Sequence, residues 1–186
     1  MTDKEFAVLF DKYMSDKRDE MKARFNRVLP SGEYIFNRFE KAPYLGYGKN
    51  TSIYDTSVVL GDVEVGDNVW IGPYTLLDGF NAKLRIGNYV SIDSGVMIYT
   101  HDTTRMYVSG GMAPAEAGDV TIGNCTVLGT MSIVSCGVTI GNHCIIGAHS
   151  YVNTDIPDCS IAAGIPAKII GKVELLDEGE VRLTYY

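Results

Sequence analysis

The sequence predicts an all-β fold in which one chain coils through many short strands, and three observations support this prediction. Aliphatic residues recur every six positions over about a hundred residues, glycine often follows them, and a small or β-branched residue mostly stands four places further on. A short strand of this kind cannot bury its apolar face alone, so successive coils must stack into one continuous core. An ordinary sandwich would not keep a six-residue register over this length.

The repeat begins at residue 53 and is interrupted twice. Its aliphatic positions are Ile53, Val59, Val65, Ile71, Leu77, Ile86, Ile92, Ile98, Ile122, Leu128, Val134, Ile140, Ile146 and Val152. Three extra residues precede Ile86, and a long excursion separates Ile98 from Ile122. The glycines that follow seven of these positions supply backbone angles that a tight corner needs.

The repeat divides the chain into three predicted parts. Residues 1–52 form a helical and capping segment, residues 53–157 the coiled repeat, and residues 158–186 a short C-terminal tail. Aromatic residues are frequent just before the repeat, where a stacked array needs a cap at its end.

Two packing helices are predicted near the N-terminus. Thr2 and Glu5 have the spacing of a capping box, and Phe6, Leu9 and Phe10 begin an apolar face at helical spacing. A helix that lies on a membrane surface would need a clearly basic polar face, which this segment lacks.

Composition narrows the possible functions. The 186 residues are 46% apolar and 21% charged, with a formal net charge of −7, which argues against a nucleic-acid-binding surface. No secretory signal and no membrane-spanning run is evident, so we expect a cytoplasmic protein. The four cysteines contain no C-x-x-C motif, so they are predicted to be small packing residues in a reducing compartment.

The repeat resembles that of the hexapeptide-repeat acyltransferases. The similarity covers about residues 53–171, and GIPAKIIG at 164–171 is similar to the segment that usually closes the repeat in that family. The resemblance, and not the periodicity, implies a left-handed parallel β-helix of about five triangular turns with three six-residue units per turn. It also implies a homotrimer with active sites between subunits.

Two irregularities meet at one place when three units make a turn. The units of Leu77 and Ile98 then stack, which brings Asp78 close to His101. The small-residue rule also fails in these two units, and such local exceptions are typical of functional sites. A histidine beside a carboxylate is the arrangement of a general base, whereas the alternative is a surface histidine at the start of a loop.

The segment YTHD at 99–102, with LDG at 77–79, is similar to sugar O-acetyltransferases of this superfamily. This similarity implies that His101 is the catalytic base.

Three carboxylates compete as the partner of His101. We predict Asp78. Asp93 lies on the preceding face of the prism. Asp102 adjoins His101, so in an extended backbone its side chain points the other way, but the backbone leaves the regular path here and Asp102 stays an alternative.

Residues 103–119 are predicted to form a flap over the site, because loops this long within a compact repeat are usually functional or disordered. Tyr107 is predicted to stack on a sugar ring and Arg105 to bind a phosphate or carboxylate. Asn81 and Asp102 are further candidates for contact with the acceptor. A loop without any such role is the alternative.

The resemblance implies that acetyl-CoA binds in a groove between subunits. If the excursion replaces one six-residue unit, then Gly129, Thr130 and Ala148 lie on the same face as His101, where their backbone would hold the pantetheine arm.

Lys168 and Lys172 are predicted to bind the cofactor phosphates. Asn153 and Thr154 stand where many relatives have a Thr-Lys pair, so one expected basic contact is missing.

The predicted function is transfer of acetyl from acetyl-CoA to a hydroxyl of a sugar or sugar-containing acceptor, by direct attack and without a metal. The alternatives are N-acetylation of an amino-sugar nucleotide and a non-catalytic assembly module. A γ-type carbonic anhydrase shares this scaffold, but the histidines at 101, 143 and 149 do not have the spacing of its metal ligands.

Overall fold

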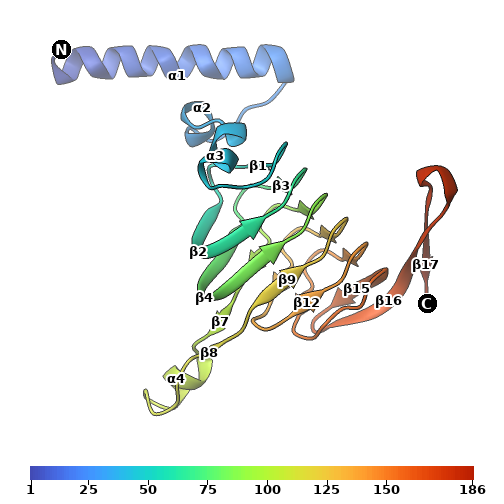
Figure 1. Ribbon diagram of the computed structural model, residues 1–186. Coiled ribbons are helices and arrows are strands. Elements are labelled where there is room, and N and C mark those ends of the chain that lie inside the picture. The colour runs from blue at the N-terminus through green and yellow to red at the C-terminus, as the bar shows by residue number, and fades with distance from the viewer.

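The computed structural model describes residues 1–186 and shows a three-sided prism of short parallel strands (Figure 1). We call its sides face A, face B and face C in the order in which the chain visits them. The corners between them are corner AB, corner BC and corner CA.

The strands of each face pair in parallel with the coil before and the coil after. Face A consists of β1 (Ser52–Ile53), β3 (Trp70–Ile71), β5 (Ser91–Ile92), β10 (Val127–Leu128), β13 (Ile145–Ile146) and β15 (Ser160–Gly164). Face B consists of the first parts of β2 (Val58–Val65) and β4 (Leu76–Ile86), then β6 (Met97–Ile98), β11 (Ile133–Val134) and β14 (Tyr151–Val152). Face C consists of the last parts of β2 and β4, then β9 (Val120–Ile122), β12 (Thr139–Ile140) and a bridge at Ile156.

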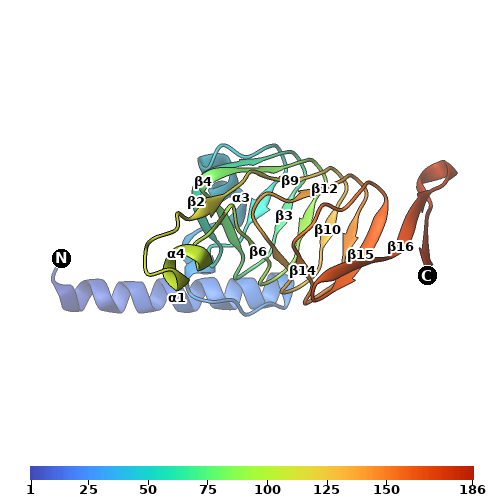
Figure 2. The same ribbon diagram turned by 90° about the horizontal axis from the view of Figure 1, so that it is seen from below.

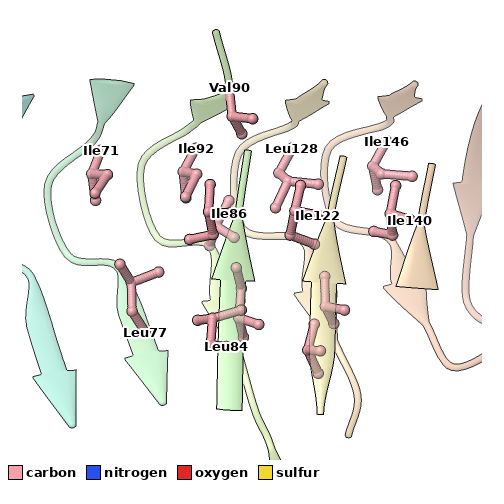
Figure 3. Packing of buried hydrophobic residues seen from close by; sticks show 14 of the residues in the cluster. Ile71, Leu77, Leu84, Ile86, Val90, Ile92, Ile122, Leu128, Ile140 and Ile146 are labelled. Atoms are coloured by element: carbon pink, nitrogen blue, oxygen red, sulfur yellow. The ribbon is translucent and has the colours of Figure 1, made fainter. Parts of the chain in front are cut away.

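The predicted six-residue register is confirmed. Every aliphatic position of the repeat is buried except Val59, which packs partly buried against the core. The side chains form columns inside the prism, as Ile71, Ile92, Leu128 and Ile146 do on face A (Figure 3). The all-β parallel β-helix is therefore confirmed, although face A has six strands where about five turns were expected.

Corner CA carries a regular row of side-chain oxygens, which we call the polar ladder. Each oxygen accepts a backbone N–H from the coil before it. The bonds run from Lys49 N to Asp67 Oδ1 (2.6 Å), from Asp67 N to Asn88 Oδ1 (2.7 Å), from Asn88 N to Asn124 Oδ1 (2.8 Å), from Asn124 N to Asn142 Oδ1 (2.9 Å) and from Asn142 N to Asp158 Oδ1 (2.7 Å). These bonds satisfy donors that the tight corner would otherwise leave unpaired.

One long helix, α1 (Asp3–Phe25), replaces the two packing helices that the sequence predicted. Its capping box is present, with Thr2 Oγ1 accepting from Glu5 N and Glu5 Oε2 accepting from Thr2 N. No residue of α1 is buried, and the helix projects beyond the prism (Figure 1). The prediction of packing was wrong because α1 contacts the rest of the chain only around α2, and most of its apolar side chains stay exposed.

The short helices α2 (Gly32–Ile35) and α3 (Arg38–Tyr44) lie at the start of the prism. Lys41 Nζ donates to three carbonyl oxygens of the first coil, those of Tyr54, Asp55 and Ser57. The Glu33 carboxylate accepts the N–H of Asp55 at 2.7 Å, and burial raises its pKa. This segment therefore caps the N-terminal end of the core.

The excursion is an ordered hairpin. β7 (His101–Asp102) pairs antiparallel with β8 (Glu116–Ala117), and α4 (Thr104–Val108) lies between them. The hairpin points away from the prism in both views (Figures 1 and 2). Within one chain it therefore does not form the expected flap over the site.

The C-terminal region is more extensive than a short tail. β15 still pairs in parallel with β13, so the prism continues beyond residue 157. β16 (Ala167–Leu175) and β17 (Val181–Tyr185) then form an antiparallel hairpin, joined by η1 (Asp177–Gly179), that stands off the end of the prism (Figure 1). No helix has both the length and the apolar character needed to cross a membrane.

Candidate active site

Asp78 and His101 meet at corner BC. Asp78 Oδ2 lies 2.7 Å from His101 Nδ1, and both atoms are buried without any other polar partner. The contact lacks the alignment of a regular hydrogen bond, so distance and burial define the pair, and such contacts often tighten only when substrate binds. The His101 side chain is 26% exposed, and its Nε2 has no hydrogen-bond partner in the chain.

The stacking of two coils produces this pair. Leu77 in β4 pairs with Ile98 in β6, so the residues that follow each strand lie at the same corner. Asp78 is almost fully buried, and its Oδ1 accepts the N–H of Phe80 at 3.0 Å. The carboxylate is therefore held from one side by its own strand and presents its second oxygen to His101.

The two competing carboxylates have other partners. Asp93 Oδ1 is 3.0 Å from the hydroxyl of Ser91, which donates to it at corner AB. Asp102 accepts the N–H of Thr104 at 2.7 Å, and hydrogen bonds from the side chain and backbone of Thr104 lower the pKa of Asp102. Of the three candidates, only Asp78 lies against the ring nitrogen of His101.

Phe80 belongs to the site although the sequence did not single it out. Its ring centroid lies 6.4 Å from that of His101, with the two planes tilted by 59°. A pattern search does not find it, because Phe80 lies in the three-residue insertion where the six-residue register is suspended. The three-residue insertion was the only feature of the sequence that could have pointed to Phe80.

The predicted acceptor contacts are spread around this corner. Asn81 is exposed next to Phe80. Arg105 and Tyr107 lie on α4, and both are about three-quarters exposed. Arg105 Nη1 is paired with Glu116 Oε1 at 2.9 Å across the hairpin, so this guanidinium is already partly neutralised.

The predicted cofactor residues do not lie on the face of His101. Leu128 pairs with Ile92 on face A, and Val134 pairs with Ile98 on face B. The excursion is therefore an insertion between two units and replaces none. As a result, Gly129, Thr130 and Ala148 lie at corner AB, whereas His101 lies at corner BC.

These residues nevertheless form one line with Lys168. A Cβ on Gly129 would lie 2.7 Å from Ala148 N, and Ala163 on the next coil pairs with Lys168. Lys172 lies elsewhere, opposite Ser160 at the other end of that strand, and its ammonium is bound by Glu174. The hydrogen bond that Lys172 donates to the Glu174 carboxylate raises the pKa of Lys172.

The three histidines occupy three different corners of the prism. His101 is at corner BC, His143 between β12 and β13 at corner CA, and His149 between β13 and β14 at corner AB. No group of three histidine, cysteine, aspartate or glutamate side chains in the chain has the geometry to hold a metal ion.

The chain resembles known acyltransferases in both sequence and fold. No sequence profile of a known protein family matches it. It is 31% identical over 148 residues to dTDP-4-amino-4,6-dideoxy-D-glucose acyltransferase from Escherichia coli, covering 72% of this chain and 77% of that protein. It is also 28% identical over 177 residues to the mitochondrial gamma carbonic anhydrase 2 of Arabidopsis thaliana, covering 87% and 60% respectively.

Two solved structures have a similar fold. AntD, an N-acyltransferase from Bacillus cereus determined as a mutant with dTDP and coenzyme A, gives a TM-score of 0.61 at 23% identity, covering 74% of this chain and 91% of that chain. A maltose O-acetyltransferase from Clostridium difficile 630 gives 0.58 at 25% identity and covers 89% of both chains.

Proposed function

Since the chain belongs to the hexapeptide-repeat, left-handed parallel β-helix acyltransferase superfamily, we propose that it transfers acetyl from acetyl-CoA to a hydroxyl group of a sugar or sugar-containing acceptor. The observation that carries this proposal is the contact of Asp78 Oδ2 with His101 Nδ1, which leaves Nε2 free at the surface. Two of the relatives named above, the dTDP-4-amino-4,6-dideoxy-D-glucose acyltransferase and the maltose O-acetyltransferase, are named for sugar substrates, which supports a sugar acceptor.

In the proposed reaction His101 is the general base. Its Nε2 takes the proton of the acceptor hydroxyl while that oxygen attacks the thioester carbonyl of acetyl-CoA. Asp78 keeps the remaining ring proton on Nδ1 and stabilises the imidazolium that forms. The tetrahedral intermediate then collapses to the acetyl ester, and the departing thiolate takes the proton from Nε2, so His101 returns to its neutral state.

The line of Gly129, Thr130, Ala148 and Lys168 is the proposed site for the pantetheine arm and a cofactor phosphate. It lies at corner AB, so a thioester bound there would not reach His101 of the same chain at corner BC. A neighbouring copy would bring its own corner AB to this corner BC. This separation supports the expected homotrimer with active sites between subunits.

The outward side chains of the prism also favour such an assembly. Face B presents Val58, Leu76, Met97, Ile133 and Tyr151. Face C presents Glu64, Arg85, Thr121 and Thr139 instead. Face B joins the two corners that the proposed reaction needs, and its apolar exterior is the kind of surface that is buried between subunits.

N-acylation of an amino-sugar nucleotide is the second candidate. It is favoured by the relative that acts on a 4-amino sugar, which is 31% identical to this chain. An amine nucleophile depends less on a general base than a hydroxyl does. The free Nε2 beside a buried carboxylate therefore favours the hydroxyl acceptor.

The proposal is tested by measuring thiol release from acetyl-CoA with a panel of sugars and nucleotide sugars, each as the hydroxyl and the amino form. We expect turnover with a hydroxyl acceptor and a loss of roughly 10²–10⁴-fold in His101→Ala. His143→Ala is the matched control, because it removes a histidine from another corner. Undiminished turnover of a hydroxyl acceptor by His101→Ala would contradict the proposed mechanism, and turnover of amines alone would favour N-acylation.

A further inference from the structure

We propose that Phe80 is the residue that selects the acceptor, by offering its ring as an apolar platform for the C–H face of a pyranose beside His101. This inference rests on the proposed function, and it adds the substrate class: a cyclic sugar in preference to an open-chain polyol. Three features of corner BC support it.

The first feature is the position of the ring. The Phe80 side chain is 69% exposed, although its ring centroid lies only 6.4 Å from that of His101. No other aromatic ring lies in this range of His101 within the chain. A large apolar surface therefore adjoins the one accessible nitrogen of the proposed base.

The second feature is the rigidity of the backbone that holds Phe80. Its N–H donates to Asp78 Oδ1 at 3.0 Å, so the backbone of Phe80 is tied to the same carboxylate that contacts His101. The preceding residue, Gly79, lies so close to β2 that a Cβ there would be 2.2 Å from the carbonyl oxygen of Asp62. Gly61 has φ +69°, and a Cβ there would lie 2.2 Å from the carbonyl oxygen of Gly79, so glycine is required at both positions.

The third feature is the match to a sugar ring. A pyranose has apolar C–H groups on its faces and hydroxyl groups around its edge. If one face lies on Phe80, a hydroxyl at the ring edge is directed towards Nε2 of His101. An open-chain polyol has the same hydroxyls but no flat C–H face, so it gains nothing from the platform.

The test compares Phe80→Ala, Phe80→Leu and Phe80→Trp with the wild-type enzyme, using a pyranoside and the matching alditol as acceptors. Loss of one aromatic contact should raise the KM for the pyranoside roughly three- to tenfold in Phe80→Ala and Phe80→Leu. Phe80→Trp should keep the wild-type KM. The KM for acetyl-CoA and for the alditol should stay within about twofold of wild type, whereas a merely structural role would change all of these values together.

Tyr89→Ala is the matched control, because Tyr89 is 65% exposed on the prism but lies at corner CA. An unchanged pyranoside KM in Phe80→Ala would overturn the inference, even if His101→Ala is inactive and the proposed function stands. Saturation-transfer NMR of the pyranoside provides a readout that does not need turnover. Binding that is lost in Phe80→Ala supports the platform even without acetyl transfer, and an absence of binding to the wild-type protein overturns it.

Discussion

Corner CA and corner BC both carry polar side chains but use them differently. At corner CA every oxygen of the polar ladder accepts a backbone N–H from the neighbouring coil at 2.6–2.9 Å. At corner BC the regular turn is replaced by two insertions, and Asp78 Oδ2 and His101 Nδ1 face only each other. Polar groups that hold the backbone stabilise the fold, whereas polar groups released from it are available for chemistry.

This contrast predicts that substitutions at the two corners have opposite consequences. Changes to the Asp78–His101 pair at corner BC should reduce turnover and leave stability nearly unchanged. Changes at corner CA should do the reverse.

The largest expected effect is that of Asp78→Asn. The amide still accepts the N–H of Phe80 but no longer fixes the proton of His101 on Nδ1, so kcat should fall by roughly 10²-fold or more. Asp93→Asn is the control, since the side chain of Asp93 bonds only to Ser91 at another corner. Steady-state kinetics that show equal rates for the two variants would contradict the assignment of Asp78.

Next in size is the effect of Asn124→Ala in the polar ladder. The variant loses the bond from Asn88 N and the bond that Asn124 Nδ2 donates to Asn142, so the free energy of unfolding should fall by about 1–2 kcal/mol. Denaturant unfolding measures this change, with Asn153→Ala as a control that removes an exposed amide without hydrogen bonds. The rate per folded molecule should be unchanged, and a selective loss of rate in Asn124→Ala would break the contrast between the corners.

A smaller effect, which is lost in acid, is expected of a substitution at Asp119, which anchors the end of the excursion. Its carboxylate accepts from Lys83 N and from Arg85, and these hydrogen bonds lower its pKa. A lowered pKa in the folded state stabilises the fold above the ordinary carboxyl pKa of about 4, and this stabilisation is lost as the pH falls through the lowered value. The stability difference between wild type and Asp119→Asn should therefore narrow from pH 7 to pH 3, and a constant difference would exclude this role.

The smallest effect is expected of Arg105→Ala. Its ion pair with Glu116 is exposed, so the unfolding free energy should change by at most about 0.5 kcal/mol. Comparison with Glu116→Ala separates the hairpin from the acceptor site. If Arg105 binds an anionic acceptor, Arg105→Ala should raise the acceptor KM and Glu116→Ala should not. Equal acceptor KM values in the two variants would exclude contact between Arg105 and the acceptor.

The sequence predicted the core because burial repeats at a fixed interval. The aliphatic positions identify which residues face inward, and parallel stacking then follows from the need to cover each strand. The pairing of Asp78 with His101 was also predictable. The only irregularity between the coils that carry them is the short insertion before Ile86, so the count of six-residue units is preserved.

The face of the prism that each six-residue unit occupies after the long excursion was not predictable in the same way. A six-residue period shows that Leu128 points inward, but every face has this period. Only the hydrogen bonds to the coil beneath decide that Leu128 stacks on Ile92 and not on Ile98. Gly129, Thr130 and Ala148 were therefore assigned to the wrong corner.

The two ends of the chain show a different limit. Helical spacing in α1 predicts an apolar face correctly, but it does not say whether the chain itself provides a surface to cover that face. β16 and β17 lack the six-residue repeat, so their pairing depends on contacts that a periodic pattern does not contain.

In the proposed mechanism Asp78 holds the proton of His101 on Nδ1 and leaves Nε2 free to act as the base. ¹⁵N NMR of the imidazole rings tests this most directly, because it needs no knowledge of the acceptor. We predict that neutral His101 carries its proton on Nδ1 and that Asp78→Asn changes this. A neutral His101 protonated on Nε2 in the wild-type protein would exclude this role of Asp78.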